Sequence, residues 1–109
     1  MALDGPLWAY IGRENVEKLE LLHNGERVPK NSITRAIIRF GTYCLDTELH
    51  NEIELTEDAQ VLEIKLGLIP DLVSGKYKSY ITIYPNLAED GIAWASANVR
   101  VAEWPVCPT

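Results

Sequence analysis

The chain has 109 residues, of which 47% are hydrophobic and 24% charged, which is enough for one hydrophobic core but not for two. Its net charge of -6, from 16 acidic and 10 basic residues, argues against a nucleic-acid partner, because an acidic surface repels a polyphosphate backbone. No apolar run reaches the roughly 18 residues of a membrane-spanning helix, so we expect no membrane partner.

The sequence carries no sign of secretion or of a metal site. Its first residues lack the basic start and apolar segment of a secretory signal, so we expect a protein that begins at Met1 and is not secreted. The two cysteines show no CxxC or Cys/His spacing, and we expect free thiols, no metal and no cofactor. Cys44, in the apolar run TYCLD, is predicted to be a small core residue, and Cys107, in the tail WPVCPT, an exposed one.

Short apolar runs with a period of two begin near the N-terminus. Residues 7–11 predict a first strand, and residues 16–23 a second with Leu19 and Leu21 on one face. Asn24-Gly25 then predicts a tight hairpin turn, because both residues tolerate positive φ.

The middle of the chain predicts one long strand and a hairpin. Residues 32–45 alternate, and the face expected to join the core holds Thr34, Ala36, Ile38 and Phe40. The opposite, apolar face with two arginines holds Ile33, Arg35, Ile37 and Arg39. Residues 51–67 read as strand, turn and strand, with the turn at Glu57-Asp58.

The last third of the chain predicts two further strands, over residues 76–85 and 91–104. The inward set of the first is Tyr77, Ser79, Ile81 and Ile83, because this choice buries both isoleucines. Its outward set is Lys78, Tyr80, Thr82 and Tyr84.

About seven to eight strands joined by Gly, Pro, Asn and Asp turns predict an all-β fold. We expect a single immunoglobulin-like antiparallel β-sandwich over residues 1–104 and a short Pro-rich tail over 105–109. Tyr77, two residues after Gly75, has the placement of the tyrosine corner of such sandwiches, where the phenol hydroxyl ties down the preceding loop. The alternative is that Tyr77 is only a strand aromatic.

Candidates for catalysis are few, and we predict that the protein is not an enzyme. His23 and His50 lie in no catalytic motif, and the glycines are scattered singly, so no phosphate-binding loop is present. Carboxylates crowd residues 46–58 and could bind calcium or act as an acid/base pair: Asp46, Glu48, Glu52, Glu54, Glu57 and Asp58. The simpler interpretation is the solvated face of a strand.

The outward aromatic residues are the best candidates for binding. Tyr80 and Tyr84, beside Lys78 and Thr82, fit a protein interface or a sugar platform on which rings stack. They also fit an ordinary solvated sheet, because Tyr and Thr favour pleated surfaces. We add Trp94 to these candidate interface residues.

Residues 72–94, LVSGKYKSYITIYPNLAEDGIAW, resemble the small immunoglobulin-like domains of tailed-bacteriophage structural proteins. The shared pattern is a loop ending in Gly-x-Tyr, an alternating strand, and a closing strand that begins near Asp-Gly-Ile-x-Trp. Residues 24–41 are similar to the front half of those domains, and the resemblance extends over residues 19–101.

The resemblance implies a virion structural protein of the tail, baseplate, fibre-adaptor or capsid-decoration type. Such a protein docks onto other virion proteins in a symmetric homo- or hetero-oligomer and is assembled in the host cytoplasm. No coiled coil or β-helical shaft accompanies the domain, so an adaptor, decoration protein or small tail component is expected in place of a whole fibre. The alternative function is a carbohydrate-binding module that uses Tyr80, Tyr84 and Trp94.

Overall fold

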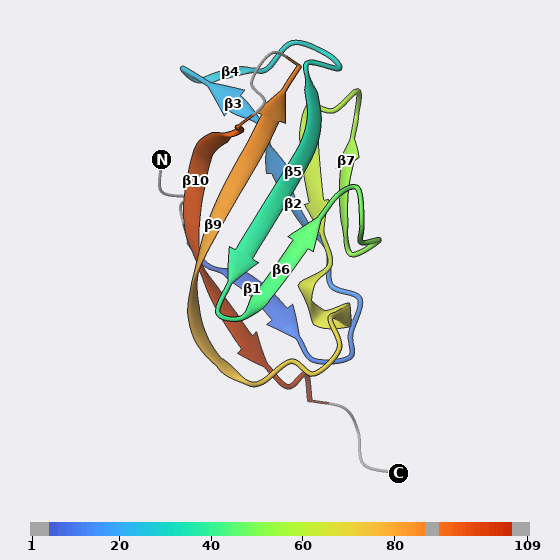
Figure 1. The fold of residues 1–109 in the computed structure, drawn as a ribbon. Coiled ribbons are helices and arrows are strands. Elements are labelled where there is room, and N and C mark those ends of the chain that lie inside the picture. Colours follow the sequence, from blue (N-terminus) through green and yellow to red (C-terminus); the bar gives the residue numbers. More distant parts are fainter. Residues whose placement is uncertain (1–4, 87–89, 106–109) are drawn as a thin grey trace.

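The computed structural model describes residues 5–86 and 90–105, and this part of the chain is all-β, as predicted (Figure 1). Its strands are β1 (Leu7–Tyr10), β2 (Glu17–Glu20), β3 (Leu22–His23), β4 (Glu26–Arg27), β5 (Ile33–Phe40), β6 (Tyr43–Asp46), β7 (Ile53–Thr56), β8 (Val61–Ile64), β9 (Gly75–Pro85) and β10 (Ile92–Ala102). A single 3-10 turn, η1 (Leu66–Leu68), follows β8. Within these residues no helix has the length and apolar character needed to cross a membrane.

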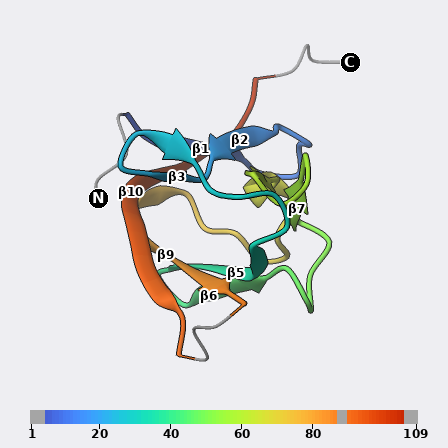
Figure 2. The same cartoon turned by 90° about the horizontal axis from the view of Figure 1, so that it is seen from above.

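The strands form two principal sheets and a small ribbon. The five-stranded sheet has the order β1-β10-β9-β5-β6, the three-stranded sheet has the order β2-β8-β7, and β3 pairs with β4. All pairings are antiparallel except that of β1 with β10. Figure 2 shows the larger sheet curling round the interior, so that β1 comes close to β2. This arrangement is compatible with a β-sandwich.

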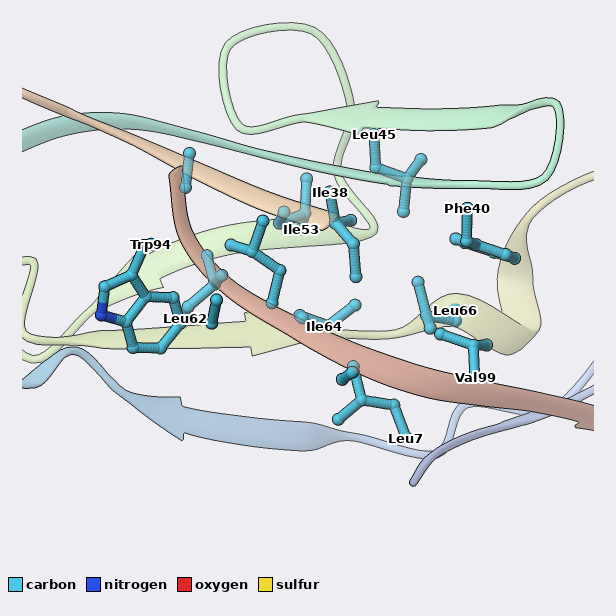
Figure 3. Close-up of a cluster of buried hydrophobic side chains, with 14 of the residues drawn as sticks. Leu7, Ile38, Phe40, Leu45, Ile53, Leu62, Ile64, Leu66, Trp94 and Val99 are labelled. Atoms are coloured by element: carbon cyan, nitrogen blue, oxygen red, sulfur yellow. The ribbon is translucent and has the colours of Figure 1, made fainter. Parts of the chain in front are cut away.

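One hydrophobic core lies between the two principal sheets (Figure 3). The five-stranded sheet contributes Ile38 and Phe40, and the three-stranded sheet contributes Leu62 and Ile64, all of which are almost completely buried. Leu66 of η1 closes one end of the core. Burying side chains of this size contributes about 1.5–3 kcal/mol each, so the packing of the two sheets stabilises both.

Two predicted turns are present where the sequence placed them. Asn24 and Gly25 have φ values of 53° and 82° and join β3 to β4. The turn between β7 and β8 begins at Glu57-Asp58 and runs through Ala59, all three residues having positive φ. These turns fix the registers of the hairpins that they close.

Two predicted strands are each divided, which is why the described residues hold ten strand segments instead of about eight. Residues 16–23 break at Leu21, which is fully buried and hydrogen-bonds through its backbone to Gln60 and Val28. Residues 32–45 break at Gly41, whose φ of 55° turns the chain from β5 into β6.

The facing predicted for the start of β5 was wrong. Ile33 is buried and Thr34 is exposed, the reverse of the prediction, whereas Ala36, Ile38 and Phe40 face the core as expected. The cause is a register irregularity between Ile33 and Arg35, which inverts the alternation at that point.

The free edge of β1 is covered by side chains of the segment that follows it. The side-chain amide of Asn15 donates from Nδ2 to the carbonyl oxygen of Trp8 (2.6 Å) and accepts at Oδ1 from the backbone N–H of Tyr10 (3.2 Å). The carboxylate of Glu17 accepts from the backbone N–H of Trp8 at 3.3 Å. The backbone groups of this edge strand therefore have partners without a neighbouring strand.

Candidate interaction surface

The predicted alternation of β9 is confirmed. Ser79 and Ile81 are buried, whereas Lys78 and Tyr80 are exposed on the outer side of the five-stranded sheet. Tyr77 is half-buried and packs against the core. The outward residues therefore sit on the middle strands of a sheet whose other side is packed, and this positions them rigidly.

The loop before β9 is held by two phenol groups. The hydroxyl of Tyr77 donates to the carbonyl oxygen of Val73 at 2.7 Å, the kind of loop contact expected from its placement. Tyr43, which the sequence analysis did not single out, donates to the carbonyl oxygen of Asp71 at 2.8 Å and accepts from the N–H of Val73 at 3.1 Å. Gly75 enters β9 with a φ of 155°, a conformation that side chains rarely adopt.

The two outward tyrosines have different surroundings. Tyr80 lies directly between Arg39 of β5 and Ser96 of β10, and 58% of its surface is exposed. Tyr84 is only half-buried, but the guanidinium carbon of Arg35 lies over its ring, 5.1 Å from the centroid. Of these two tyrosines, Tyr80 is therefore the one whose ring is not covered by another side chain.

The prediction of Trp94 as an interface residue was wrong. Its side chain is only 8% exposed, belongs to the core cluster, and donates from Nε1 to the carbonyl oxygen of Leu22 at 3.1 Å. A register irregularity between Ala93 and Ala95 breaks the alternation of β10 and turns the indole inward.

Cys44 also faces the opposite way from the prediction. It is exposed, because it lies opposite Arg39 on the outer side of the sheet. The inward positions of β6 are occupied instead by Tyr43 and Leu45, which follow from the turn at Gly41. Cys107 lies outside the described residues.

One carboxylate of the acidic run is not solvated as expected. Asp46 is buried on the outer side of β6, where Nε and Nη2 of Arg35 both donate to its carboxylate, with Nε 3.0 Å from Oδ1. The backbone N–H of Glu48 donates to Oδ1 at 2.9 Å. The hydrogen bonds from Arg35 lower the pKa of Asp46, burial opposes this shift, and the bond from Glu48 adds to it. The pair is a structural clamp between β5 and β6.

Among the described residues, neither histidine forms a hydrogen bond with this carboxylate. Nδ1 of His50 accepts a hydrogen bond from the backbone N–H of Asp46 at 3.0 Å and thus stabilises the turn after β6. His23 lies exposed on β3, next to the hairpin turn. In the two described ranges, no three His, Cys, Asp or Glu side chains gather closely enough to hold a metal ion.

The cations are distributed unevenly over the molecule. Five of the ten lysines and arginines form ion pairs: Lys18, Arg27, Lys30, Arg35 and Lys65. Four of the others lie on the outer side of β5, β9 and β10, where they are exposed and have no ion pair among the described residues: Arg39, Lys76, Lys78 and Arg100. Of these four, only Lys78 was a predicted interface residue, although the sequence held a signal for the other three. The segments of β5, β9 and β10 contain no Asp or Glu at all.

Two shallow hollows lie over β9 and β10 on this side. One, of about 340 Å³, has polar donors from Lys76, Lys78, Asn98 and Arg100 in its lining. The other, of about 250 Å³, lies beside Tyr80 and Ser96. Ammonium, guanidinium and amide groups around one hollow suit carboxylates or other oxyanions. The comparisons with known proteins add no further guide, since no family model and no curated protein matches the chain.

Proposed function

We propose that the chain is a non-enzymatic structural protein of a bacteriophage virion that acts through protein–protein contacts in a symmetric assembly. The observation that carries the proposal is the outer side of β5, β9 and β10, where exposed Tyr80 shares one face with four cations that form no ion pair among the described residues. Tyrosine and arginine are the residues enriched at the centres of protein interfaces, and the packed sheet beneath them is already ordered before binding.

An immunoglobulin-like sandwich is part of this proposal. The order β2-β8-β7 corresponds to strands B, E and D of that fold, and β5-β9-β10 to strands C, F and G. The hydroxyl bond from Tyr77 to the loop before β9 supports the assignment, because the fold carries its tyrosine corner at the start of strand F. The resemblance of residues 72–94 to phage domains supports the virion role.

Cross-linking within intact particles tests the proposal. Particles purified from the culture that produces this chain should contain it, and amine cross-linking followed by mass spectrometry should join Lys76 and Lys78 to another virion protein or to a second copy. Lys65, which is paired with Glu14 at 3.0 Å, is the internal control and should cross-link less. If the chain is absent from the particles, or cross-links to no other protein and to no second copy within them, the proposal is wrong.

The second candidate function is carbohydrate binding, which the uncovered ring of Tyr80 beside the smaller hollow favours. The stacking platform would be smaller than expected, because Arg35 covers Tyr84 and Trp94 is buried. Binding on a glycan array that is lost in Tyr80→Ala and kept in Tyr84→Ala would support this function. An array without bound glycans would exclude it.

A further inference from the structure

We propose that the outer side of the five-stranded sheet docks onto the three-stranded sheet of a second copy of this chain, so that copies associate head to tail. The basic face is defined by Arg39, Lys76, Lys78, Tyr80 and Arg100, on β5, β9 and β10. The inference rests on the proposed structural function and identifies one of its partners.

The basic face holds like charges together, and no carboxylate of the described residues forms an ion pair with them. Lys76 lies directly opposite Arg100 in the β9–β10 ladder, and like charges at directly opposed positions destabilise a sheet. Arg100 has one favourable contact, with its guanidinium carbon 5.7 Å from the ring centroid of Trp8, but that contact leaves its charge uncompensated. A bound group with negative charge would relieve this repulsion.

The three-stranded sheet carries the opposite charge. Its outer side presents Glu54 of β7 and Glu63 of β8, and carboxylates flank it at both ends of β7: Glu52 and Glu57. Lys18 pairs with Glu63 at 3.8 Å, so the local cation is already engaged. Glu52, Glu54 and Glu57 form no ion pair with any described residue. The cations that interact electrostatically with Glu54 and Glu57 are Lys65 and Arg27, and these are paired with Glu14 and Glu20.

The two charged faces lie on opposite sides of the molecule. The outer sides of β5 and β9 and of β2 point away from each other across the core (Figures 1 and 2). A contact that joins the basic face of one copy to the acidic sheet of the next is therefore heterologous, and each copy can use both faces at once. Such contacts build rings or filaments.

The chemistry of the basic face fits carboxylates on a protein surface. Lys76, Lys78, Arg100 and Asn98 donate into a hollow of about 340 Å³, which has room for a carboxylate side chain. Tyr80 beside them supplies apolar contact area at low entropic cost. A second copy is favoured over a nucleic acid because this same chain supplies the complementary acidic sheet.

Sedimentation of the purified chain at different salt concentrations is the first test. We expect association at up to about 1 mM protein in low salt. It should weaken as salt rises from about 0.01 M to about 1 M, because the Debye length falls from about 30 Å to about 3 Å. A chain that stays monomeric at every salt concentration would overturn the inference.

Charge reversal then identifies the two faces. Lys78→Glu and Glu54→Lys should each weaken association by about tenfold, because each replaces an attraction by a repulsion. A mixture of the two variants should associate again, since the reversed face of each is complementary to a face of the other. Arg13→Glu is the matched control on an exposed loop and should have no effect, and circular dichroism checks that every variant is folded.

Failure of rescue in a mixture of folded variants would overturn head-to-tail docking. Head-to-tail docking would also be overturned if the chain did not associate with itself but bound a single-stranded oligonucleotide, and if Lys78→Glu abolished that binding. Either result leaves the virion role open, because that role is decided by the presence of the chain in particles. Absence from particles together with rescue in solution would reject the virion role and keep the docking.

Discussion

The two principal sheets share one core but present opposite charges to solvent. The segments β5, β9 and β10 contain five of the ten lysines and arginines and no Asp or Glu. The segments β2, β7 and β8 contain four glutamates and one lysine. The net charge of -6 is therefore the sum over two surfaces of opposite charge. It does not exclude an anionic partner on the basic side of the molecule. The charge of a sheet face is more informative than the charge of the chain.

Truncating the core from either sheet should have the largest effect. Ile38→Ala in β5 and Leu62→Ala in β8 each remove a side chain that is 0% exposed, and each should lower the free energy of unfolding by about 2–5 kcal/mol. Urea denaturation followed by fluorescence and by circular dichroism measures this. If the sheets truly share a core, both variants unfold in one transition. Two separated transitions in either variant would show that the two sheets are separate folding units.

Breaking the ion pair between Arg35 and Asp46 should have the next largest effect on stability, and this effect should depend on pH. The lowered pKa of Asp46 keeps its carboxylate ionised in the folded chain. The pair therefore stabilises the fold at pH values above about 3.9, the pKa of Asp in the unfolded chain, and this stabilisation is lost as the pH falls through the lower pKa of the folded chain. Asp46→Asn should therefore be less stable than the parent at pH 7, with the gap narrowing below about pH 4. Thermal melts across this range measure the gap.

Glu103→Gln, beyond the end of β10, is the control, since Glu103 is exposed and forms no ion pair with the described residues. Its stability should follow that of the parent at all pH values. A constant gap for Asp46→Asn between pH 7 and pH 3 would mean that the pair contributes by packing and not by charge.

Removing the hydroxyl of Tyr77 should have a smaller effect. Tyr77→Phe loses the bond to Val73 and should cost about 1 kcal/mol, with faster hydrogen exchange in the loop before β9. Tyr80→Phe is the control on the same strand, because its exposed hydroxyl has no partner in the described chain. Equal stabilities of the two variants would reduce Tyr77 to a packing residue of the core.

The smallest expected effect is an increase in the free energy of unfolding, where the variants above lower it. Lys76→Thr removes a charge that opposes Arg100 and introduces a residue that favours strands, so it should raise the free energy of unfolding by about 0.2–1 kcal/mol. The same variant should associate less with itself than the parent. Thermal melting and sedimentation on one preparation measure both, and a variant less stable than the parent would show that the like charges are not repelling each other.

The sequence predicted the elements of the fold better than the facing of single residues. Alternation was sufficient for β9, where Ser79 and Ile81 are buried and Tyr80 is exposed as expected. It failed where the strand pairing is irregular, since the shifts near Ile33 and near Trp94 are set by neighbouring strands and leave no mark in the local pattern.

The candidate surface was only partly predictable for a similar reason. Tyr80 and Lys78 follow from alternation on one strand, but the basic face needs the strand order that brings Arg39 and Arg100 to either side of them. The clamp of Asp46 by Arg35 likewise requires the β5–β6 pairing. The absence of acidic residues from three strand segments could have been read from the sequence, once charges were counted strand by strand.

The amide of Asn15 has a consequence for how copies of this chain can meet. With one side chain satisfying the N–H of Tyr10 and the C=O of Trp8, β1 offers no hydrogen-bonding template to a strand from another molecule. Together with Glu17, which accepts from the N–H of Trp8, Asn15 takes the place of a neighbouring strand, and the sheet cannot be extended at this edge by strand addition, the kind of growth that leads to amyloid. Copies of the chain therefore cannot pair strand to strand along β1, and a contact between copies in this region has to be made by the faces of the sheets.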